Sequence, residues 1–221
     1  MSRDVLLLGG AFDPPHMGHM ALASRVLFNM SEKFHKDFDL WFLPSCSTDF
    51  SYKIHEKIHH RINMLNYLIH GEIQDPRITV CNIEMELNNR PGTYAVVKAL
   101  IKAYPQLSFR YVMGIDQVAG IRRWRKSRDL LKSIPFVIFS RTGHTSYVSS
   151  FWFQSEPHIF FNEKPLRNPV SSSTIRSTLL GKKRDEFLNN NEATQGLPSS
   201  IKKYILEQDL YKGAKLWAAT S

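Results

Sequence analysis

The stretch of sequence that decides the fold is Gly9-Gly10-Ala11-Phe12-Asp13-Pro14-Pro15-His16-Met17-Gly18-His19. Before it stands an apolar run, Val5 to Leu8, whose length and composition predict a buried strand. After it, apolar residues from Met20 to Met30 recur at helical spacing. This glycine–histidine string (Gly9 to His19) therefore joins a predicted strand to a predicted helix.

The alternation of short apolar runs and longer helical patterns continues along the chain. Further strands are expected at residues 40–43, 78–83, 109–113, 136–139 and 159–161, and further helices at 54–69, 94–104, 173–180 and 199–208. Repeated strand–helix–strand units indicate parallel strands with crossover helices on both faces. The sequence thus predicts a three-layer α/β fold, in which ligands bind beyond the carboxyl ends of the strands.

The glycine–histidine string has the features of a phosphate-binding loop. Glycines after a strand let the backbone approach a phosphate closely, and a helix start offers N–H groups to an anion. His16 and His19, expected in the first turn of the helix, are three residues apart and share one face. Two imidazoles beside amide donors suit a polyphosphate undergoing displacement, where catalysis is mostly positioning and charge stabilisation. A tight turn with two surface histidines is the alternative.

A second candidate phosphate motif is Val170-Ser171-Ser172-Ser173-Thr174-Ile175-Arg176. Ser and Thr are good N-cap residues, and Arg176 falls in the first turn of the helix that they start. Hydroxyl groups, amides and a guanidinium together can clamp a triphosphate. A serine-rich cap without a ligand is the alternative for this motif alone. Two such motifs in one chain favour phosphate binding.

The glycine–histidine string resembles the H-x-G-H signature of the nucleotidyltransferase superfamily. In its longer form it is similar to the nicotinate and nicotinamide mononucleotide adenylyltransferases, and the similarity extends from about Val5 to Gly213. The resemblance implies one Rossmann-like nucleotidyltransferase domain at residues 1–213, with a helical C-terminal part at about 171–213 and a tail at 214–221. It also implies the reaction, which is adenylyl transfer from ATP to nicotinate mononucleotide, giving deamido-NAD and pyrophosphate in NAD biosynthesis.

The resemblance further implies which residues form the site. Those implied in catalysis are His16, His19 and Arg176. Those implied in ATP binding are Gly9, Gly10, Phe12, His16, His19, Lys53, Gly114, Asp116, Ser172, Ser173 and Arg176. Those implied in binding the mononucleotide are Ser45, Thr93, Tyr94 and Trp124, with the indole stacked on the pyridine ring. Mg²⁺ would travel with the triphosphate, and no metal ion held by the protein itself is expected.

Two departures from the family pattern leave the acceptor open. The family has Pro-Asn-x-x-Pro-Pro-His-Lys after the second strand, whereas the segment from Ser45 to Lys53 lacks those prolines and the Asn. Ala11 also replaces the usual Thr. Nicotinamide mononucleotide, or another phosphate monoester such as phosphopantetheine, is therefore an alternative acceptor. A noncatalytic nucleotide-binding sensor is an alternative from a different class.

Composition and charge narrow the class of protein. The 221 residues carry a formal charge of +9, which attracts polyanions such as nucleic acid or a nucleoside triphosphate. The basic residues are scattered and form no long stripe, so nucleic-acid binding is not expected.

The apolar runs are too short to span a bilayer, and the first residues do not resemble a signal peptide. With two cysteines outside metal-ligand spacing, we expect a reduced, cytoplasmic protein. His55 and His59 are interpreted as part of a surface helix, and the sequence predicts no oligomeric state.

Overall fold

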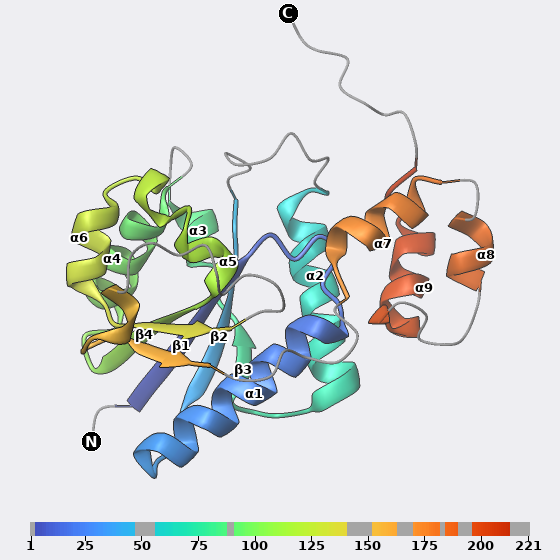
Figure 1. Ribbon diagram of the computed structural model, residues 1–221. Helices are drawn as coiled ribbons and strands as arrows, with labels where there is room; N and C mark the ends of the chain where they lie inside the picture. The colour runs from blue at the N-terminus through green and yellow to red at the C-terminus, as the bar shows by residue number, and fades with distance from the viewer. Residues whose placement is uncertain are drawn as a thin grey trace, which may run out of the picture. The chain divides into compact units, whose positions relative to one another are not determined.

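The computed structural model describes residues 3–46, 56–87, 91–140, 152–162, 170–181, 184–189 and 196–212 (Figure 1). The chain divides into two compact units. The sheet unit comprises Met1–Gly10, Ala23–Ser47 and Arg77–Arg167, and the helical unit comprises Ala11–Leu22, Thr48–Pro76 and Asn168–Ser221. One division therefore falls inside the glycine–histidine string. The single domain at 1–213 and its helical part at about 171–213 stay predictions, and the tail at 214–221 lies outside the described residues.

The sheet unit is built on parallel strands. These are β1 (Arg3–Gly10), β2 (Asp39–Pro44), β3 (Ile78–Val80), β4 (Leu107–Gly114), β5 (Phe136–Phe139) and β6 (Ile159–Phe161). They form one sheet in the order β3-β2-β1-β4-β5-β6, and each neighbouring pair is parallel. The order reverses between β1 and β4, which is where open α/β sheets bind ligands. The predicted Rossmann-like α/β fold is confirmed.

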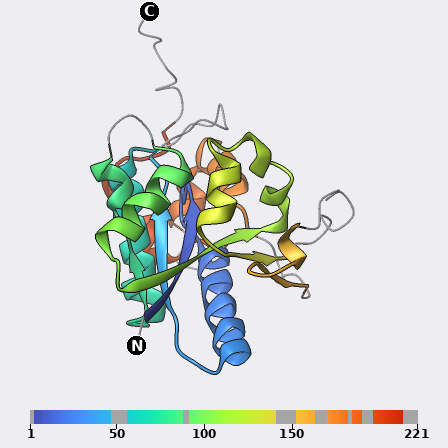
Figure 2. The ribbon, with the colours of Figure 1, turned by 90° about the vertical axis from the view of Figure 1, so that its left-hand side faces the viewer.

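Helices cover both faces of this sheet. The helices α4 (Thr93–Ala103) and α6 (Ser127–Ser133) lie on one face, and the part of α1 (Met17–Phe34) that belongs to the sheet unit lies on the other (Figures 1 and 2). The reason is that right-handed crossovers place α1 and α6 on opposite faces when the chain leaves β1 and β4 in opposite directions. The shorter elements are α3 (Ile83–Glu86), α5 (Ile115–Val118), η2 (Ile121–Arg123) and η3 (Trp152–Gln154). The predicted three layers are thus present.

The core between the sheet and α4 and α6 follows the alternation of the strands. Every second residue of a strand points to the same face. The buried residues of this core include Val5, Leu7, Val97, Leu100, Phe109, Tyr111, Met113, Leu130, Phe136 and Ile138. Burial of these apolar side chains fixes the strand ends from which the candidate site is built.

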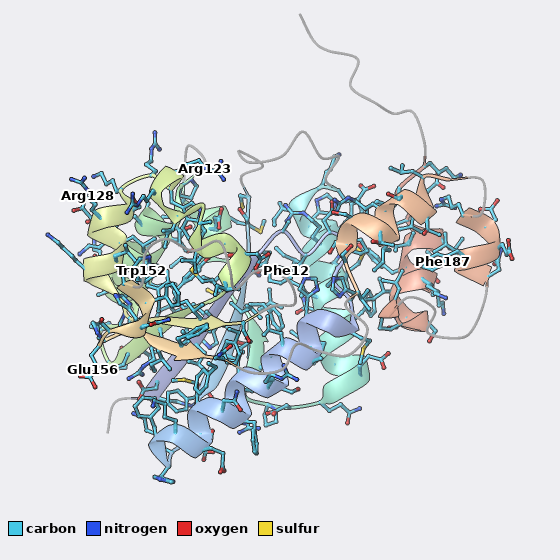
Figure 3. All side chains as sticks on the ribbon, viewed as in Figure 1. Phe12, Arg123, Arg128, Trp152, Glu156 and Phe187 are labelled. Atoms are coloured by element: carbon cyan, nitrogen blue, oxygen red, sulfur yellow. The ribbon has the colours of Figure 1, made fainter. Side chains whose placement is uncertain are left out.

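The helical unit consists of helices from separate parts of the chain. They are α2 (Ile58–Leu68), continued by the π-helical turn η1 (Ile69–Ile73), and α7 (Ser172–Leu179), α8 (Arg184–Asn189) and α9 (Ser199–Glu207). Helix α9 packs against α2 and α8, and α8 also packs against α7. Lys202 is buried in this unit, and its ammonium lies 4.8 Å from the ring centroid of Phe187, which Figure 3 labels on α8.

The structure corrects several predicted elements. The strand predicted at 78–83 ends at Val80, because the backbone has left the extended region at Asn82 (φ −97°, ψ 11°), the residue before α3. The helix predicted at 54–69 begins at Ile58 in the described part of the chain. Gly9 and Gly10 belong to β1, since both pair with β2. Helices α6 and α8 were not predicted. No helix in the described ranges combines the length and the apolar composition needed to cross a membrane.

Candidate active site

The carboxyl end of β1 in the sheet unit lies under the Tyr111 side chain of β4. A Cβ atom on Gly9 would lie 2.0 Å from the Tyr111 hydroxyl oxygen, so only glycine fits there. The Thr93 side chain hydrogen-bonds to the same hydroxyl, and Tyr94 lies beside Thr93 in the first turn of α4. Burial, assisted by the nearby charge of Glu84, raises the pKa of Tyr111 well above its usual value, so the hydroxyl stays neutral. Gly9 and Thr93, which are both predicted site residues, thus contact Tyr111, for which the sequence suggested no role.

The loop after β2 is tethered at its start by a buried carboxylate. The Ser45 amide donates a hydrogen bond to the Gly10 carbonyl (2.9 Å), and the Ser45 hydroxyl donates to Glu84 Oε1 (3.4 Å). The Cys46 amide donates to the same Glu84 oxygen at 2.8 Å. Ser45, predicted to contact the mononucleotide, is therefore held beside the end of β1. The rest of this loop, with the predicted ATP ligand Lys53, lies outside the described residues.

The carboxyl end of β4 turns into α5 at Gly114. A Cβ atom on Gly114 would lie 2.4 Å from Asp116 Oδ1, so the carboxylate folds back over the glycine. Asp116 lies in the first turn of α5, where a helix favours negative charge. The structure thus places both predicted residues at this strand end and makes the glycine necessary for the position of the carboxylate.

Trp124 directly follows η2 and is half-buried. Its ring meets the Tyr111 ring edge-on, with centroids 6.0 Å apart and an interplanar angle of 81°. It also packs against the core between the sheet and α4 and α6. The neighbouring Arg123 and Arg128 are exposed (Figure 3). Packing therefore fixes the indole, while its partial exposure leaves ring surface on which a flat ligand can stack.

In the helical unit, His16 and His19 form a locked pair. His16 directly precedes α1 and is buried, whereas His19 lies within α1, so only His19 is in the first helical turn. Their ring centroids are 3.8 Å apart. The His16 amide donates to His19 Nδ1, and the Gly18 amide donates to His16 Nδ1, each at 3.1 Å. Phe12, with a left-handed φ of 49°, presents its ring to His19 at 5.0 Å.

These two hydrogen bonds decide the tautomer of each ring. A nitrogen that accepts an amide N–H carries no proton, so both imidazoles are neutral with the proton on Nε2. Gly18 is needed for this arrangement, because a Cβ atom on it would lie 2.9 Å from the His16 ring. The pair is therefore held as two Nε2–H donors by the backbone of its own segment.

The start of α7 is joined to the same segment. The Ser171 hydroxyl caps α7 by accepting from the Thr174 amide at 3.1 Å. The Ser172 hydroxyl donates to the Pro14 carbonyl at 2.9 Å. Arg176 is buried; one of its amino groups donates to the Asp13 carbonyl, and the other donates to Ser173 Oγ at 3.3 Å. The structure therefore brings Ser172, Ser173 and Arg176 to the segment that carries the histidines.

The predicted site residues are divided between the two units. In the sheet unit, at the carboxyl ends of β1, β2 and β4 or around Tyr111, these are Gly9, Gly10, Ser45, Thr93, Tyr94, Gly114, Asp116 and Trp124. In the helical unit they are Phe12, His16, His19, Ser172, Ser173 and Arg176. The described part of the chain contains no group of three or more His, Cys, Asp or Glu side chains placed to hold a metal ion. His59 is exposed on α2, and His55 lies outside the described residues.

The strand order is that of a Rossmann-like fold, and similarity to known proteins shows that the chain is a nucleotidyltransferase. Residues 7–178 match the family described as cytidylyltransferase-like. Over 213 residues the chain is 30% identical to the "Probable nicotinate-nucleotide adenylyltransferase" of Bacillus pumilus, covering 95% of this chain and 99% of that relative. It is 28% identical over 213 residues to the nicotinate-nucleotide adenylyltransferase of Bacillus subtilis, with the same coverage.

Similarity to solved structures agrees on the fold. The nicotinic acid mononucleotide adenylyltransferase of Plasmodium falciparum, complexed with APC, is 22% identical and superposes with a TM-score of 0.72, covering 95% of this chain and 97% of that one. The chain therefore belongs to the cytidylyltransferase-like family and, within it, to the nicotinate-nucleotide adenylyltransferases.

Proposed function

We propose that this protein transfers the adenylyl group of ATP to nicotinate mononucleotide, giving deamido-NAD and pyrophosphate. The observation that carries the proposal is the pair of neutral histidines at the start of α1, whose Nδ1 atoms accept backbone N–H groups. The names of the relatives from Bacillus support the choice of acceptor. A 24%-identical Plasmodium falciparum structure complexed with NaAD supports it as well.

In the reaction, a 5′-phosphate oxygen of the mononucleotide attacks the α-phosphorus of ATP. A bond forms between that oxygen and the α-phosphorus, and the bond from the α-phosphorus to the bridging oxygen of the β-phosphate breaks, releasing pyrophosphate. His16 and His19 donate their Nε2–H groups to phosphate oxygens on which negative charge builds up. Donors that are already oriented lower the barrier because they need no reorganisation at the moment of reaction.

Arg176 and the serines of α7 bind the β- and γ-phosphates in this proposal. The guanidinium has five N–H donors, and its bonds to the Asp13 carbonyl and Ser173 use only some of them. Those bonds hold the group in one orientation, so a triphosphate meets a preorganised cation. Ser172 is oriented in the same way by its bond to the Pro14 carbonyl.

In this proposal Mg²⁺ would accompany the triphosphate and would neutralise part of its charge. The phosphate oxygens would supply most of its ligands, as is usual for Mg²⁺ bound with a nucleotide. The protein contributes the amide, imidazole and guanidinium donors described above.

For the acceptor, we assign stacking on the pyridine ring to Trp124. Its indole is fixed by Tyr111 and the core, so stacking requires little additional ordering of the side chain. Ser45, Thr93 and Tyr94 contact the remainder of the mononucleotide in this proposal. We also propose that the protein acts in the cytoplasm.

A direct assay tests the proposal. The protein is incubated with ATP, Mg²⁺ and, in separate reactions, nicotinate mononucleotide, nicotinamide mononucleotide or phosphopantetheine, and the product is identified by its mass. Deamido-NAD from the first reaction, formed faster than either other product, is the expected result. Binding of ATP without product in any reaction would show a nucleotide sensor, and salt-dependent oligonucleotide binding without ATP binding would show a nucleic-acid-binding protein.

A further inference from the structure

Asp13 of the glycine–histidine string is a buried carboxylate held from distant parts of the chain. The side chain has no exposed surface. Its Oδ1 accepts a hydrogen bond from the Tyr211 hydroxyl at 2.5 Å and from the Glu56 amide at 3.2 Å. Its Oδ2 lies 3.9 Å from the nearer amino group of Arg176. Tyr211, 198 residues farther along the chain, thus reaches the segment that carries the histidines.

These contacts close into a ring of three residues. The Tyr211 amide donates to Glu56 Oε1 at 2.8 Å, so Tyr211 binds Glu56 through its backbone and Asp13 through its side chain. Tyr211 has a φ of 55°, a left-handed conformation that is uncommon for a residue with a side chain. Such a conformation persists where the surroundings determine it. The ring thus orients both polar groups of Tyr211 toward the histidine segment and Glu56.

The electrostatics keep the Tyr211 hydroxyl a donor. Burial and the adjacent Asp13 carboxylate raise the pKa of Tyr211 well above its usual value. Burial also raises the pKa of Glu56, and the charge of Asp13 adds to that effect. A protonated phenol beside a buried carboxylate makes a short, charge-assisted hydrogen bond.

The backbone of the same segment is held by separate hydrogen bonds from two arginines. The Arg61 guanidinium donates to the Ala11 carbonyl at 2.5 Å and to the Glu56 carbonyl at 2.9 Å. Arg176 donates to the Asp13 carbonyl. The segment at residues 11–13 is therefore held through its backbone and through the Asp13 side chain. It ends three residues before His16.

We propose that Tyr211, in the turn that follows α9, is a positioning residue for His16 and His19. Its hydroxyl holds Asp13, and Asp13 holds the segment that places both imidazoles for phosphoryl chemistry. This inference rests on the proposed adenylyl transfer. Tyr211 is buried, and in this proposal it acts by keeping the histidines in one geometry.

The chain offers a matched control in Tyr204 of α9. Tyr204 is buried to a similar degree, at 7% exposed against 3% for Tyr211. Its hydroxyl accepts from Asn63 Nδ2 at 2.9 Å and lies 2.9 Å from His60 Nδ1, on α2. Removing this hydroxyl costs a comparable buried contact in the same unit without touching the histidine segment.

The first test compares the kinetics of Tyr211→Phe and Tyr204→Phe. We expect Tyr211→Phe to lower kcat by about tenfold or more, with KM for ATP changed by less than about threefold, because misplaced catalytic groups affect the reacting state most. Tyr204→Phe should keep kcat within about twofold of the wild type, as expected for a purely structural contact. Equal kcat for Tyr211→Phe and wild type, or equal losses in both variants, would overturn the inference.

The second test needs no turnover. Hydrogen–deuterium exchange of the peptide covering residues 12–19 should be faster in Tyr211→Phe by about tenfold and unchanged in Tyr204→Phe, because the anchored segment opens more easily without the hydroxyl. Unchanged exchange in Tyr211→Phe contradicts the inference. A wild-type protein without adenylyl transfer contradicts the proposed function instead, so the two failures are distinguishable.

A second pair of variants serves if Tyr211→Phe does not fold. Asp13→Asn keeps an oxygen acceptor for the tyrosine hydroxyl, and Asp13→Ala removes it. We expect Asp13→Asn to retain at least about a third of wild-type kcat and Asp13→Ala to lose about tenfold or more. Equal kcat in the two variants overturns the inference.

Discussion

The His16 amide donates a hydrogen bond to Nδ1 of His19 at 3.1 Å, so the backbone of the first histidine sets the tautomer of the second. The Gly18 amide does the same for His16. Neutral imidazoles with fixed Nε2–H groups can stabilise charge that builds up on phosphate oxygens. Backbone amides of the same segment thus orient both rings through their Nδ1 atoms.

His19→Ala should lower turnover by about 10²–10³-fold while the protein remains folded, because one oriented donor to the reacting phosphate is lost. Pyrophosphate release under saturating substrates measures the effect. The control is His59→Ala, since His59 is exposed on α2. Equal turnover in His19→Ala and the wild type would remove His19 from the catalytic groups.

Gly9→Ala should destabilise the fold by about 1–3 kcal/mol, because its methyl group would overlap the Tyr111 hydroxyl. Chemical denaturation measures the free energy of unfolding. Tyr111→Phe removes the overlapping oxygen, so the double variant should be less destabilised than the sum of the two single variants. Additive losses would show that the hydroxyl is not the cause of the requirement for glycine.

Trp124→Ala should raise KM for the mononucleotide by about tenfold and leave KM for ATP unchanged, since stacking of a ring on an aromatic side chain is worth about 1–3 kcal/mol. Trp124→Phe keeps a stacking surface, so its KM for the mononucleotide should lie between the values for the wild type and Trp124→Ala. Initial rates with each substrate varied in turn provide the measurement. An equal rise in both KM values would point to disrupted packing against Tyr111.

Asp4 should make stability depend on pH. Burial opposes ionisation of Asp4, but hydrogen bonds from Lys36 and Arg110 outweigh burial and hold its pKa below the usual 3.8. Its contribution is therefore fully present above about pH 4 and is lost as the pH falls through the lowered pKa. Asp4→Asn should cost about 1–3 kcal/mol at neutral pH, and less below pH 4.

Urea denaturation of both proteins across this pH range measures the difference. Asp37→Asn is the control, because Asp37 is 92% exposed and its partner Arg77 lies 3.8 Å away. Asp37→Asn should change the free energy of unfolding by less than about 1 kcal/mol at any pH. A difference between wild type and Asp4→Asn that stays constant down to pH 2 would contradict the assignment.

Local patterns were sufficient to predict the sheet, because each strand and the longer helices carry their own periodicity. Helices α6 and α8 escaped prediction because seven and six residues are too few to establish a helical period. Likewise, α3 follows β3 so closely that the predicted strand, ending at Ile83, runs into the first residue of α3. In these elements the local sequence pattern is too short to identify a separate helix.

The candidate site was predictable where its residues lie in contiguous strings, as for His16, His19 and Arg176. Tyr111 and Glu84 escaped because an apolar strand and a short helix hide a buried hydroxyl and a buried carboxylate that act on other segments. The bond from Tyr211 to Asp13 joins residues at opposite ends of the chain, and no spacing rule relates them. Such long-range polar contacts become visible only once the backbone is folded.

The two units interleave along the sequence, with divisions after Gly10, Leu22, Ser47, Pro76 and Arg167. No single cut can therefore separate the two units, since a cut at any of these divisions splits at least one unit between the two fragments. A protein split at any of these divisions would have to recombine its two chains to restore at least one of the units. Fusion partners are accordingly better attached at an end than inserted between units, because the polypeptide contains no joint at which one whole unit stops and the other begins.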